Sequence, residues 1–448
     1  MTNFEDTIIA PATPSGVSAL AVIRVSGNDA ISIVNSCFSK DIKKADGYTI
    51  HYGHILDGTK KVDEVLLSIF RNPKSYTGED SVEISGHGSP YIVQRITETI
   101  LRNGARMAEP GEFTLRAFLN KKLDLTQAEA VADMISSNSE ASLQMAIHQM
   151  RGGFSNDIAK LRQELIDFAA LIELENDFGE EDVEFANRPK LKSLIESLLH
   201  QIEKLRTSFS AGNVLKNGIN TVIAGKPNAG KSTLLNALLN EERAIVSDVA
   251  GTTRDTIEEI FTLEGIQFRL IDTAGLRDSS DNIEQIGVSK AKESIQKADL
   301  IIYLFDAQIT NPKQLETELA DLPPTRRLII LANKTDKQSC NPKDWPENTL
   351  FIAAKTKNID PLLNELIRIA SQYEYGNETL VNNARHADAL SKSSILLQKI
   401  ITGINDEIPS DLIAIDIRNT LYQLGLITGE VTNDEVLESI FTRFCIGK

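Results

Sequence analysis

The sequence has few of the residues that cross-link chains or bind metals. Only three cysteines, Cys37, Cys340 and Cys445, occur in 448 residues, and they lie far apart. The six histidines are also scattered, with only His51 and His54 close together. Three cysteines are too few for a disulfide framework or a zinc cluster. We therefore expect a reducing compartment and no zinc site.

Long apolar runs and an excess of positive charge are also missing. The sequence contains no apolar run of about 18 residues that could span a bilayer. Its first residues, M-T-N-F-E-D-T-I-I-A-P, lack the basic and apolar regions of a secretory signal, so we expect a cytoplasmic protein without membrane contact. The formal net charge is -16. Because phosphate binding needs clusters of Lys and Arg, this charge argues against a protein that binds nucleic acid over its whole surface.

The length of 448 residues predicts two or three domains. Residues 1–118 mix strand-like stretches at 19–27 and 62–70 with helical spacing at 29–36 and 91–101, which predicts a small α+β domain. Residues 119–213 then show mainly the apolar periodicity of helices. It begins near L-T-Q-A-E-A, where Thr126 and Glu129 have the spacing of a capping box. One apolar stripe in this region comprises Ile158, Leu161, Leu165, Phe168 and Ile172.

Residues 214–378 alternate apolar strands with helical stretches. The strands are T-V-I-A-G, F-R-L-I-D, L-I-I-Y-L-F-D, R-L-I-I-L-A-N and L-F-I-A-A, a pattern typical of a mostly parallel sheet with helices on both faces. Residues 379–448 return to helix and are too few for a stable core of their own. We infer that they pack on the earlier helices, so that the α/β domain is inserted within one helical domain.

A phosphate-binding loop follows the first of these strands. The stretch Gly225-Lys-Pro-Asn-Ala-Gly-Lys-Ser232 matches G-x-x-x-x-G-K-[ST] and lies directly before a helix. Backbone N–H groups of such a loop surround phosphate, Lys231 is expected to reach the β- and γ-phosphates, and Ser232 to ligate Mg²⁺. The alternative, a glycine-rich turn that matches by chance, is disfavoured by this strand-loop-helix context.

Guanine specificity is indicated by N-K-T-D at residues 333–336, directly after another strand. The carboxylate of Asp336 can accept both the N1–H and the amino N–H of guanine, whereas adenine offers no such pair of donors. The order of G-x-x-x-x-G-K-S, G-T-T-R-D, D-T-A-G and N-K-T-D resembles the GTPase series. We therefore expect a multidomain fold: an α+β N-terminal domain, an all-α helical domain and an inserted α/β Ras-like P-loop GTPase domain.

Two further loops complete the predicted GTP site. A-G-T-T-R-D at residues 250–255 resembles switch I, with Thr253 as a second Mg²⁺ ligand, and Asp272 opens D-T-A-G. The loop Ala353-Ala354-Lys355 resembles the last guanine-side loop, although its usual Ser is Ala here. The predicted GTP-binding residues are Asn228, Ala229, Gly230, Lys231, Ser232, Thr233, Ser247, Thr252, Thr253, Asp272, Thr273, Ala274, Gly275, Asn333, Lys334, Asp336, Ala353, Ala354 and Lys355.

The glutamine that orients water in Ras-type enzymes is replaced by Leu276, which has no polar atom. A polar substitute could come from Asn228 in the phosphate-binding loop or from the segment R-D-S-S-D-N-I-E-Q-I-G. That segment holds four charged candidates, Arg277, Asp278, Asp281 and Glu284. The residues alone do not choose among them.

The whole chain resembles the MnmE (TrmE) family of bacterial tRNA modification GTPases. The resemblance rests on S-Y-T-G-E-D-S-V-E-I-S-G-H-G, on P-G-E-F-T-L-R-A-F-L-N-K-K-L-D-L-T-Q-A-E-A, on G-K-P-N-A-G-K-S and on the terminal F-C-I-G-K. It implies a K⁺ ion beside the phosphate-binding loop that acts like an arginine finger, and Glu284 as the residue that activates water through a second water. The implied K⁺ ligands are Asn228, Ser247, Thr252 and the carbonyl of Val249.

The resemblance also implies that residues 1–118 form a homodimer and bind 5-formyltetrahydrofolate or a related folate. Arg24, Glu83, Lys122 and Lys448 would contact the folate, although Arg24 and Glu83 viewed alone could be a surface ion pair. Cys445 in the C-terminal C-I-G-K motif would lie near this pocket, whereas a lone Cys is by default a small buried hydrophobe.

As function, the resemblance implies a K⁺-dependent GTPase. With a FAD-dependent MnmG-like subunit, in a heterotetramer or larger complex, it would add an aminomethyl or carboxymethylaminomethyl group to C5 of the wobble uridine of certain tRNAs. The folate would supply one carbon, and GTP hydrolysis would drive G-domain dimerisation. Two alternatives are a ribosome-assembly GTPase, for which a basic RNA-binding appendage would be expected, and a slow signalling switch.

Overall fold

The computed structural model describes most of the chain, in two compact units. The described residues are 6–177, 188–241, 245–246, 259–271, 294–296, 298–323, 327–336, 342–373, 379–432, 434–442 and 444–447. Unit 1 comprises Met1–Ala132, His148–Leu199 and Lys392–Lys448, and unit 2 comprises Asp133–Ile147 and His200–Ser391. Among the described residues, no helix has the length and apolar character needed to cross a membrane.

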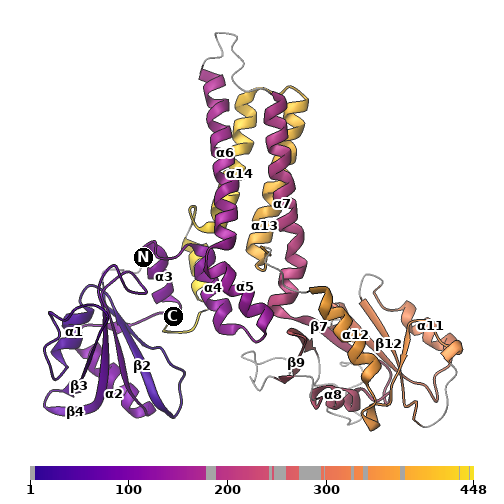
Figure 1. Cartoon of the computed structure of the whole chain (residues 1–448), viewed down its shortest axis with the longest axis horizontal. Coiled ribbons are helices and arrows are strands. Elements are labelled where there is room, and N and C mark those ends of the chain that lie inside the picture. Colours follow the sequence, from indigo (N-terminus) through magenta and orange to yellow (C-terminus); the bar gives the residue numbers. More distant parts are fainter. Residues whose placement is uncertain are drawn as a thin grey trace. The chain divides into compact units, whose positions relative to one another are not determined.

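A six-stranded sheet forms the N-terminal part of unit 1 (Figure 1). In spatial order, its strands are β3 (Thr49–Asp57), β4 (Lys60–Phe70), β5 (Ser81–Gly88), β2 (Ser18–Ser26), β1 (Ile8–Pro11) and β6 (Arg106–Met107). Only the β1–β6 pair is parallel. Helices α1 (Ala30–Ser36) and α2 (Pro90–Arg102) cover one face of this sheet. The sheet residues Ile23, Leu67 and Ile84 are buried beneath them.

The opposite face of this sheet carries side chains that alternate with the buried ones, because successive strand residues point to opposite faces. Leu20, Ile50, Tyr52 and Leu66 are 67, 67, 52 and 46% exposed there. This face therefore presents apolar side chains to solvent. The strand and helix stretches predicted in this part correspond to β2, β4, α1 and α2, and they are confirmed.

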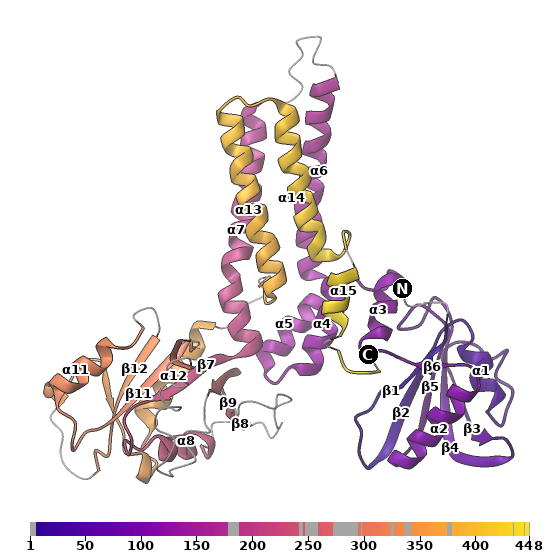
Figure 2. The ribbon, with the colours of Figure 1, turned by 180° about the vertical axis from the view of Figure 1, so that it is seen from behind.

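The helical part continues after α3 (Glu112–Leu119). Its helices are α4 (Leu125–Ser136), α5 (Glu140–Met150), α6 (Gly153–Asp177), α7 (Arg188–Asn217), α13 (Ala384–Asn405), α14 (Ser410–Thr428) and α15 (Asp434–Phe441). Within unit 1, α6 packs along α14, with the unit 1 parts of α7 and α13 beside them (Figures 1 and 2).

The apolar stripe predicted on α6 is confirmed, since each of its five residues is at most 2% exposed. Packing of the C-terminal helices on the earlier ones is also found. Arg162 of α6 donates to the backbone oxygen of Leu421 on α14 at 2.5 Å and pairs with Glu430 at 2.6 Å. The two halves of the helical region are thus joined by polar as well as apolar contacts.

The predicted start signal of α4 was wrong by two residues. Asp124 rather than Thr126 caps the helix, because its carboxylate accepts the backbone N–H of Gln127 at 2.9 Å. Gln127 reciprocates by accepting the N–H of Asp124 at 2.9 Å. The hydroxyl of Thr126 instead donates to the Asp124 carboxylate at 2.7 Å. The capping pair is therefore Asp124 and Gln127, which has the same three-residue spacing.

Unit 2 contains a seven-stranded sheet (Figure 2). In spatial order, its strands are β13 (Thr349–Phe351), β12 (Arg327–Asn333), β11 (Leu300–Asp306), β7 (Ile219–Ala224), β10 (Ile266–Leu270), β9 (Glu259–Leu263) and β8 (Ile245–Val246). The five strands from β13 to β10 are parallel, as the alternating apolar runs predicted. The main helices of this part are α8 (Lys231–Leu239), α11 (Pro312–Ala320) and α12 (Asp360–Ala370).

Helix α5 contributes to the core of unit 2. Met145 is 3% exposed and lies in the same buried cluster as Leu215, Ile219 and Leu366. Ala141, one turn earlier, packs against this cluster. The core of the α/β unit therefore includes a helix that lies about 70 residues before its first strand in the sequence.

Candidate functional site

The phosphate-binding loop connects β7 to α8 and depends on two glycines. Gly225 and Gly230 have φ angles of 143° and 102°, which side chains of L-residues rarely adopt. A Cβ at Gly225 would collide with the backbone oxygen of Leu304, and one at Gly230 would collide with the side chain of Asn333. The loop therefore passes too close to β11 and to the start of the N-K-T-D loop for any other residue.

Lys231 and Ser232 begin α8, where backbone N–H groups and the helix dipole favour an anion. The ammonium of Lys231 donates to the backbone oxygens of Gly225 and Lys226 at 2.8 and 3.0 Å. Burial lowers its pKa below the ordinary lysine value. A phosphate at the helix start offers this ammonium a charged acceptor in place of two carbonyls. Ser232 and Thr233 are exposed, so their hydroxyls can meet a ligand.

Asn333 joins three loops of the predicted site. Its side chain is buried, donates to the backbone oxygen of Ala229 at 2.8 Å and accepts the N–H of Ala354 at 3.1 Å. The phosphate-binding loop, the N-K-T-D loop and the loop before the 3-10 helix η2 (Ala354–Thr356) are thereby held together. The structure brings together the three segments that the sequence predicted to surround GTP.

Lys334 also joins the N-K-T-D loop to the phosphate-binding loop. Its ammonium donates to the backbone oxygen of Asn228 at 2.8 Å and pairs with Asp306 at 2.7 Å. Asp336, two residues later, is exposed, and its carboxylate can accept the N–H donors of guanine. In the last loop, Ala353 and Ala354 are buried, whereas Lys355 is exposed.

Two acidic residues support this site and were not predicted. Asp306 ends β11 and is only 8% exposed, so its charge requires the Lys334 partner. The carboxylate of Glu318 on α11 pairs with Lys226 of the phosphate-binding loop and accepts the hydroxyl of Tyr303. Asp306 could have been suspected from its place at the end of an apolar strand, but no local pattern marks Glu318.

The remaining predicted residues of the GTPase site lie outside the described residues. They include Glu284 and the proposed K⁺ and Mg²⁺ ligands of switch I. The set is Ser247, Val249, Thr252, Thr253, Asp272, Thr273, Ala274, Gly275 and Glu284. Lys448 of the predicted folate site lies outside them as well.

The predicted folate residues of unit 1 are only partly together. Arg24 of β2 and Glu83 of β5 are partners in the sheet register and form an ion pair at 2.8 Å. Lys122 is exposed and donates instead to the backbone oxygen of Pro73 at 3.0 Å. No ion pair or hydrogen bond in the described part of the chain joins Lys122 to Arg24 or Glu83.

The C-terminal tail lies on the N-terminal part of unit 1. The backbone oxygen of Cys445 accepts the N–H of Gly111 at 3.5 Å, and a Cβ at Gly447 would collide with the backbone oxygen of Pro11. Cys445 itself is exposed, contrary to the default expectation of a buried cysteine. Cys37, in contrast, is buried, and burial raises the pKa of its thiol to about 11.

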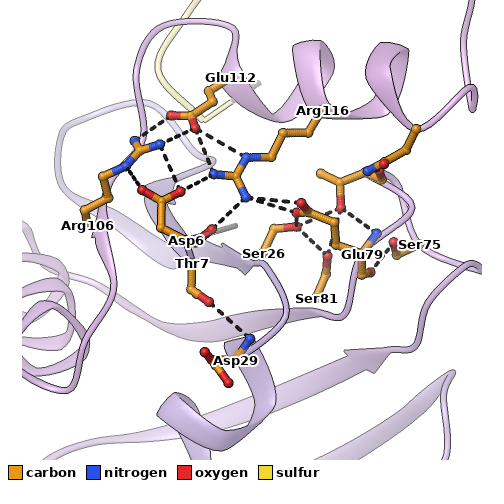
Figure 3. Close-up of polar contacts among 12 residues, drawn as sticks. Asp6, Thr7, Ser26, Asp29, Ser75, Glu79, Ser81, Arg106, Glu112 and Arg116 are labelled. Carbon is orange, nitrogen blue, oxygen red and sulfur yellow. Dashed lines mark hydrogen bonds and ion pairs between the residues drawn. The ribbon is translucent and has the colours of Figure 1, made fainter. Parts of the chain in front are cut away.

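A partly buried ionic network joins α3 to Asp6, Glu79 and Arg106 (Figure 3). The guanidinium of Arg116, 1% exposed, pairs with Asp6, Glu79 and Glu112 at 2.8, 3.2 and 2.9 Å. Arg106 also pairs with Asp6 and Glu112, at 2.6 and 2.5 Å. Burial alone would raise the pKa values of Asp6 and Glu112. Hydrogen bonds from the two arginines, and for Glu112 also from the backbone N–H of Glu109, outweigh burial and lower both pKa values.

The phosphate-binding loop, the N-K-T-D loop and the parallel sheet of unit 2 define a P-loop GTPase. Two family models match the chain: the MnmE helical domain over residues 125–445 and the N-terminus of the GTP-binding protein TrmE over residues 7–122. The chain belongs to the MnmE family. This confirms the predicted family and multidomain fold class.

Curated relatives match over the full length. The chain is 52% identical over 460 residues to tRNA modification GTPase MnmE of Flavobacterium psychrophilum, covering 99% of this chain and 100% of that protein. Identity to the protein of the same name in Bacteroides thetaiotaomicron is 44% over 464 residues, with 99 and 100% covered. A crystal structure of Era with MgGDPNP and a segment of 16S ribosomal RNA aligns with 39% of this chain and 65% of that chain, at 28% identity and a TM-score of 0.26.

Proposed function

We propose that this protein hydrolyses GTP as part of a reaction that modifies tRNA. The observation that carries the proposal is the match of about half of all residues, over 99% of the chain, to relatives named tRNA modification GTPase MnmE. The preorganised phosphate-binding and guanine-side loops support GTP as the nucleotide. We further propose that the domains span residues 1–118, 119–213 with 379–448, and 214–378.

We propose Mg²⁺ and K⁺ as the cations of the GTPase reaction. Ser232, exposed at the start of α8, can offer its hydroxyl to Mg²⁺. Asn228 is exposed, so its side-chain oxygen can meet a cation beside the phosphate-binding loop. A cation there would offset the charge that develops during phosphoryl transfer. Thr253, Ser247, Thr252 and the Val249 carbonyl are the proposed remaining ligands, and Glu284 the residue that activates water.

For unit 1 we propose a homodimer and a bound 5-formyltetrahydrofolate. The exposed apolar side chains on the open sheet face favour burial against a second copy. Glu83 on that face can accept N–H donors of a pterin ring, and the exposed Lys122 can meet an anionic group. Cys445 and Lys448 are proposed to border this pocket.

The proposed reaction is the addition of an aminomethyl or carboxymethylaminomethyl group to C5 of the wobble uridine. A FAD-dependent MnmG-like subunit is the proposed partner, in a heterotetramer or larger complex. Because this chain has a net charge of -16, we propose that the partner makes much of the contact with tRNA. GTP hydrolysis would drive dimerisation of the G domains and rearrange the active site that the protein shares with its partner.

Nucleoside mass spectrometry of total tRNA from a strain that lacks this gene tests the proposal. The C5-modified wobble nucleoside should disappear, and the wild-type gene should restore it, whereas a Glu284→Ala gene should not. Unchanged tRNA in the deletion strain would reject the tRNA role and favour the ribosome-assembly alternative.

Comparison of GTP turnover in KCl and NaCl tests the cation and the slow-switch alternative separately. We expect K⁺-specific turnover that Asn228→Ala and Glu284→Ala both abolish. Equal, slow turnover in the two salts would support the slow signalling switch.

A further inference from the structure

The carboxylate of Glu318 on α11 connects the phosphate-binding loop to the sheet of unit 2. It forms an ion pair with the ammonium of Lys226, the second residue of that loop. It also accepts the hydroxyl of Tyr303 on β11 at 2.5 Å. The two contacts use different carboxylate oxygens, Oε1 for Lys226 and Oε2 for Tyr303. One side chain of α11 therefore holds the loop and the strand at the same time.

Glu318 is the more firmly placed member of its pair with Lys226. Leu315, one turn earlier on α11, is buried with Tyr303 and Ile330 in a cluster that attaches the helix to β11 and β12 (Figure 2). The side chain of Glu318 is 20% exposed, whereas that of Lys226 is 59% exposed. The packed helix therefore determines where the lysine side chain lies.

The charges of this group favour the observed contacts. Burial would raise the pKa of Glu318, but hydrogen bonds from Lys226 and Tyr303 outweigh it and lower this pKa. Burial and the neighbouring carboxylate raise the pKa of the Tyr303 hydroxyl. At neutral pH the carboxylate is thus ionised, and the hydroxyl keeps the proton that it donates.

The backbone of Lys226 contacts the lysine that is expected to bind phosphate. Its oxygen accepts the ammonium of Lys231 at 3.0 Å, beside the oxygen of Gly225 at 2.8 Å. The same oxygen accepts the N–H of Ala229 at 3.3 Å. Pro227 follows directly, and its ring restricts the backbone of both residues. A displacement of Lys226 would therefore move the Lys231 ammonium and the turn of the loop.

The side chain of Lys226 would compete with Lys231 if it were not paired. Both ammonium groups belong to one short loop, and a phosphate attracts both. The carboxylate of Glu318 balances the charge of Lys226 and holds its ammonium at α11. The loop then directs the ammonium of Lys231 to the phosphate.

We infer that Glu318 is a positioning residue for GTP hydrolysis that acts through Lys226 to fix the phosphate-binding loop and the Lys231 ammonium. This inference deepens the proposed GTP hydrolysis and rests on it. Without Glu318, the released Lys226 would still attract the phosphates of GTP, so binding would persist in a less productive geometry. Loss of this contact should therefore lower kcat and leave KM nearly unchanged.

Steady-state GTP hydrolysis by the full-length protein in KCl tests this role. Glu318→Gln keeps an acceptor for Tyr303 but removes the charge, and it should lower kcat about tenfold with KM within about threefold of wild type. Lys226→Met should lower kcat about three- to tenfold. The double variant should match Lys226→Met within about twofold, because Glu318 acts only through Lys226. Lys226→Arg preserves the ion pair and should retain kcat within about twofold.

Two further measurements separate positioning from a general structural effect. Glu316→Gln removes an exposed carboxylate from the same helix and should leave kcat and KM unchanged. Thermal unfolding of Glu318→Gln should give a GDP-sensitive midpoint within about 2 °C of wild type, because an ion pair with an exposed lysine adds little stability. A merely structural role predicts the reverse, a lower midpoint with normal kcat at saturating GTP.

The contrary outcomes are distinct. If Glu318→Gln hydrolyses GTP as fast as wild type, the inference is rejected and the proposed hydrolysis stands. If the effects of Glu318→Gln and Lys226→Met multiply in the double variant, Glu318 does not act through Lys226, and the inference is rejected as well. A raised KM with unchanged kcat would assign the pair to nucleotide binding instead. If the wild-type protein does not hydrolyse GTP, the proposed hydrolysis and this inference fail together.

Discussion

The ammonium of Lys334 donates a hydrogen bond to the backbone oxygen of Asn228, 106 residues earlier in the chain, at a distance of 2.8 Å. The same ammonium forms an ion pair with the buried Asp306 at 2.7 Å. One side chain thus links the guanine-side loop, the phosphate-binding loop and the end of β11. Its effect on nucleotide binding should exceed that of an exposed lysine.

Lys334→Met should weaken the binding of a fluorescent GDP analogue by about 10- to 100-fold. The variant loses a charge-assisted bond to the phosphate-binding loop and removes the positive charge that pairs with the buried Asp306 carboxylate. Fluorescence titration gives the dissociation constant. Lys313→Met on the exposed surface of α11 is the matched control and should change the constant by less than a factor of two. Equal affinities of wild type and Lys334→Met would refute the bridging role.

Asp336→Asn should lower the preference for GTP over ITP. Inosine lacks the amino group of guanine, so the wild-type carboxylate accepts one hydrogen bond more from GTP than from ITP. A hydrogen bond to a charged group contributes about 1.5–3 kcal/mol, so the wild type should bind GTP about tenfold or more tightly than ITP. An amide oxygen is a weaker acceptor, and the amide N–H₂ cannot accept at all. Competition of GDP and IDP for the fluorescent analogue measures the ratio. An unchanged ratio would show that Asp336 does not read the base.

Acid should destabilise the sheet domain of unit 1 through Asp6 and Glu112. The pKa values of both carboxyls lie below their ordinary values of 3.8 and 4.5 in the folded protein, because hydrogen bonds from Arg106 and Arg116, and for Glu112 also from the backbone N–H of Glu109, outweigh burial. Carboxyls with lowered folded pKa values contribute stability above their unfolded pKa, and this contribution is lost as pH falls through the folded values.

We therefore expect urea midpoints of the full-length protein to fall as pH drops below about 5. Glu112→Gln should lower the midpoint at pH 7 and make its decline at acid pH shallower. Glu98→Gln, on the half-exposed edge of α2, is the control. An identical pH slope for Glu112→Gln and wild type would show that the network does not govern acid stability.

Met145→Ala should destabilise the GTPase unit although it lies in a helix outside the nucleotide motifs. A buried Met truncated to Ala costs about 2–5 kcal/mol through lost burial and the cavity left behind. Thermal unfolding in the presence and absence of GDP should show a lower midpoint for the transition that GDP shifts. Met134→Ala, at an exposed position of α4, should change it little. A normal GDP-sensitive transition in Met145→Ala would remove α5 from that core.

Elements with strong local patterns were predictable from the sequence. Most residues of strands β11 and β12 are buried on both faces, and these strands therefore appear as nearly continuous apolar runs. Strands β1, β3 and β5 were not recognised. In β3, solvent-facing Ile50 and Tyr52 blur the expected alternation, because apolar residues occupy both faces. The capping pair of α4 was predicted wrongly because Asp124-x-x-Gln127 and Thr126-x-x-Glu129 have the same spacing. Only the hydrogen bonds of the folded chain distinguish the two pairs.

The nucleotide site was predictable where its residues are contiguous. The phosphate-binding loop and the N-K-T-D loop each place their polar groups within a few residues. Glu318 and Asp306 come from separate elements and have no fixed spacing from those motifs, so only the folded chain brings them to Lys226 and Lys334.

The position of Met145 and Ala141 limits how far the GTPase can be treated as a portable module. A fragment cut from residue 214 to residue 378 would leave α5 behind and expose the apolar surface that this helix covers, around Leu215, Ile219 and Leu366. Such a fragment would tend to self-associate through that surface or lose part of its rigidity. Transplanting the GTPase into another protein therefore requires a host helix that can replace α5.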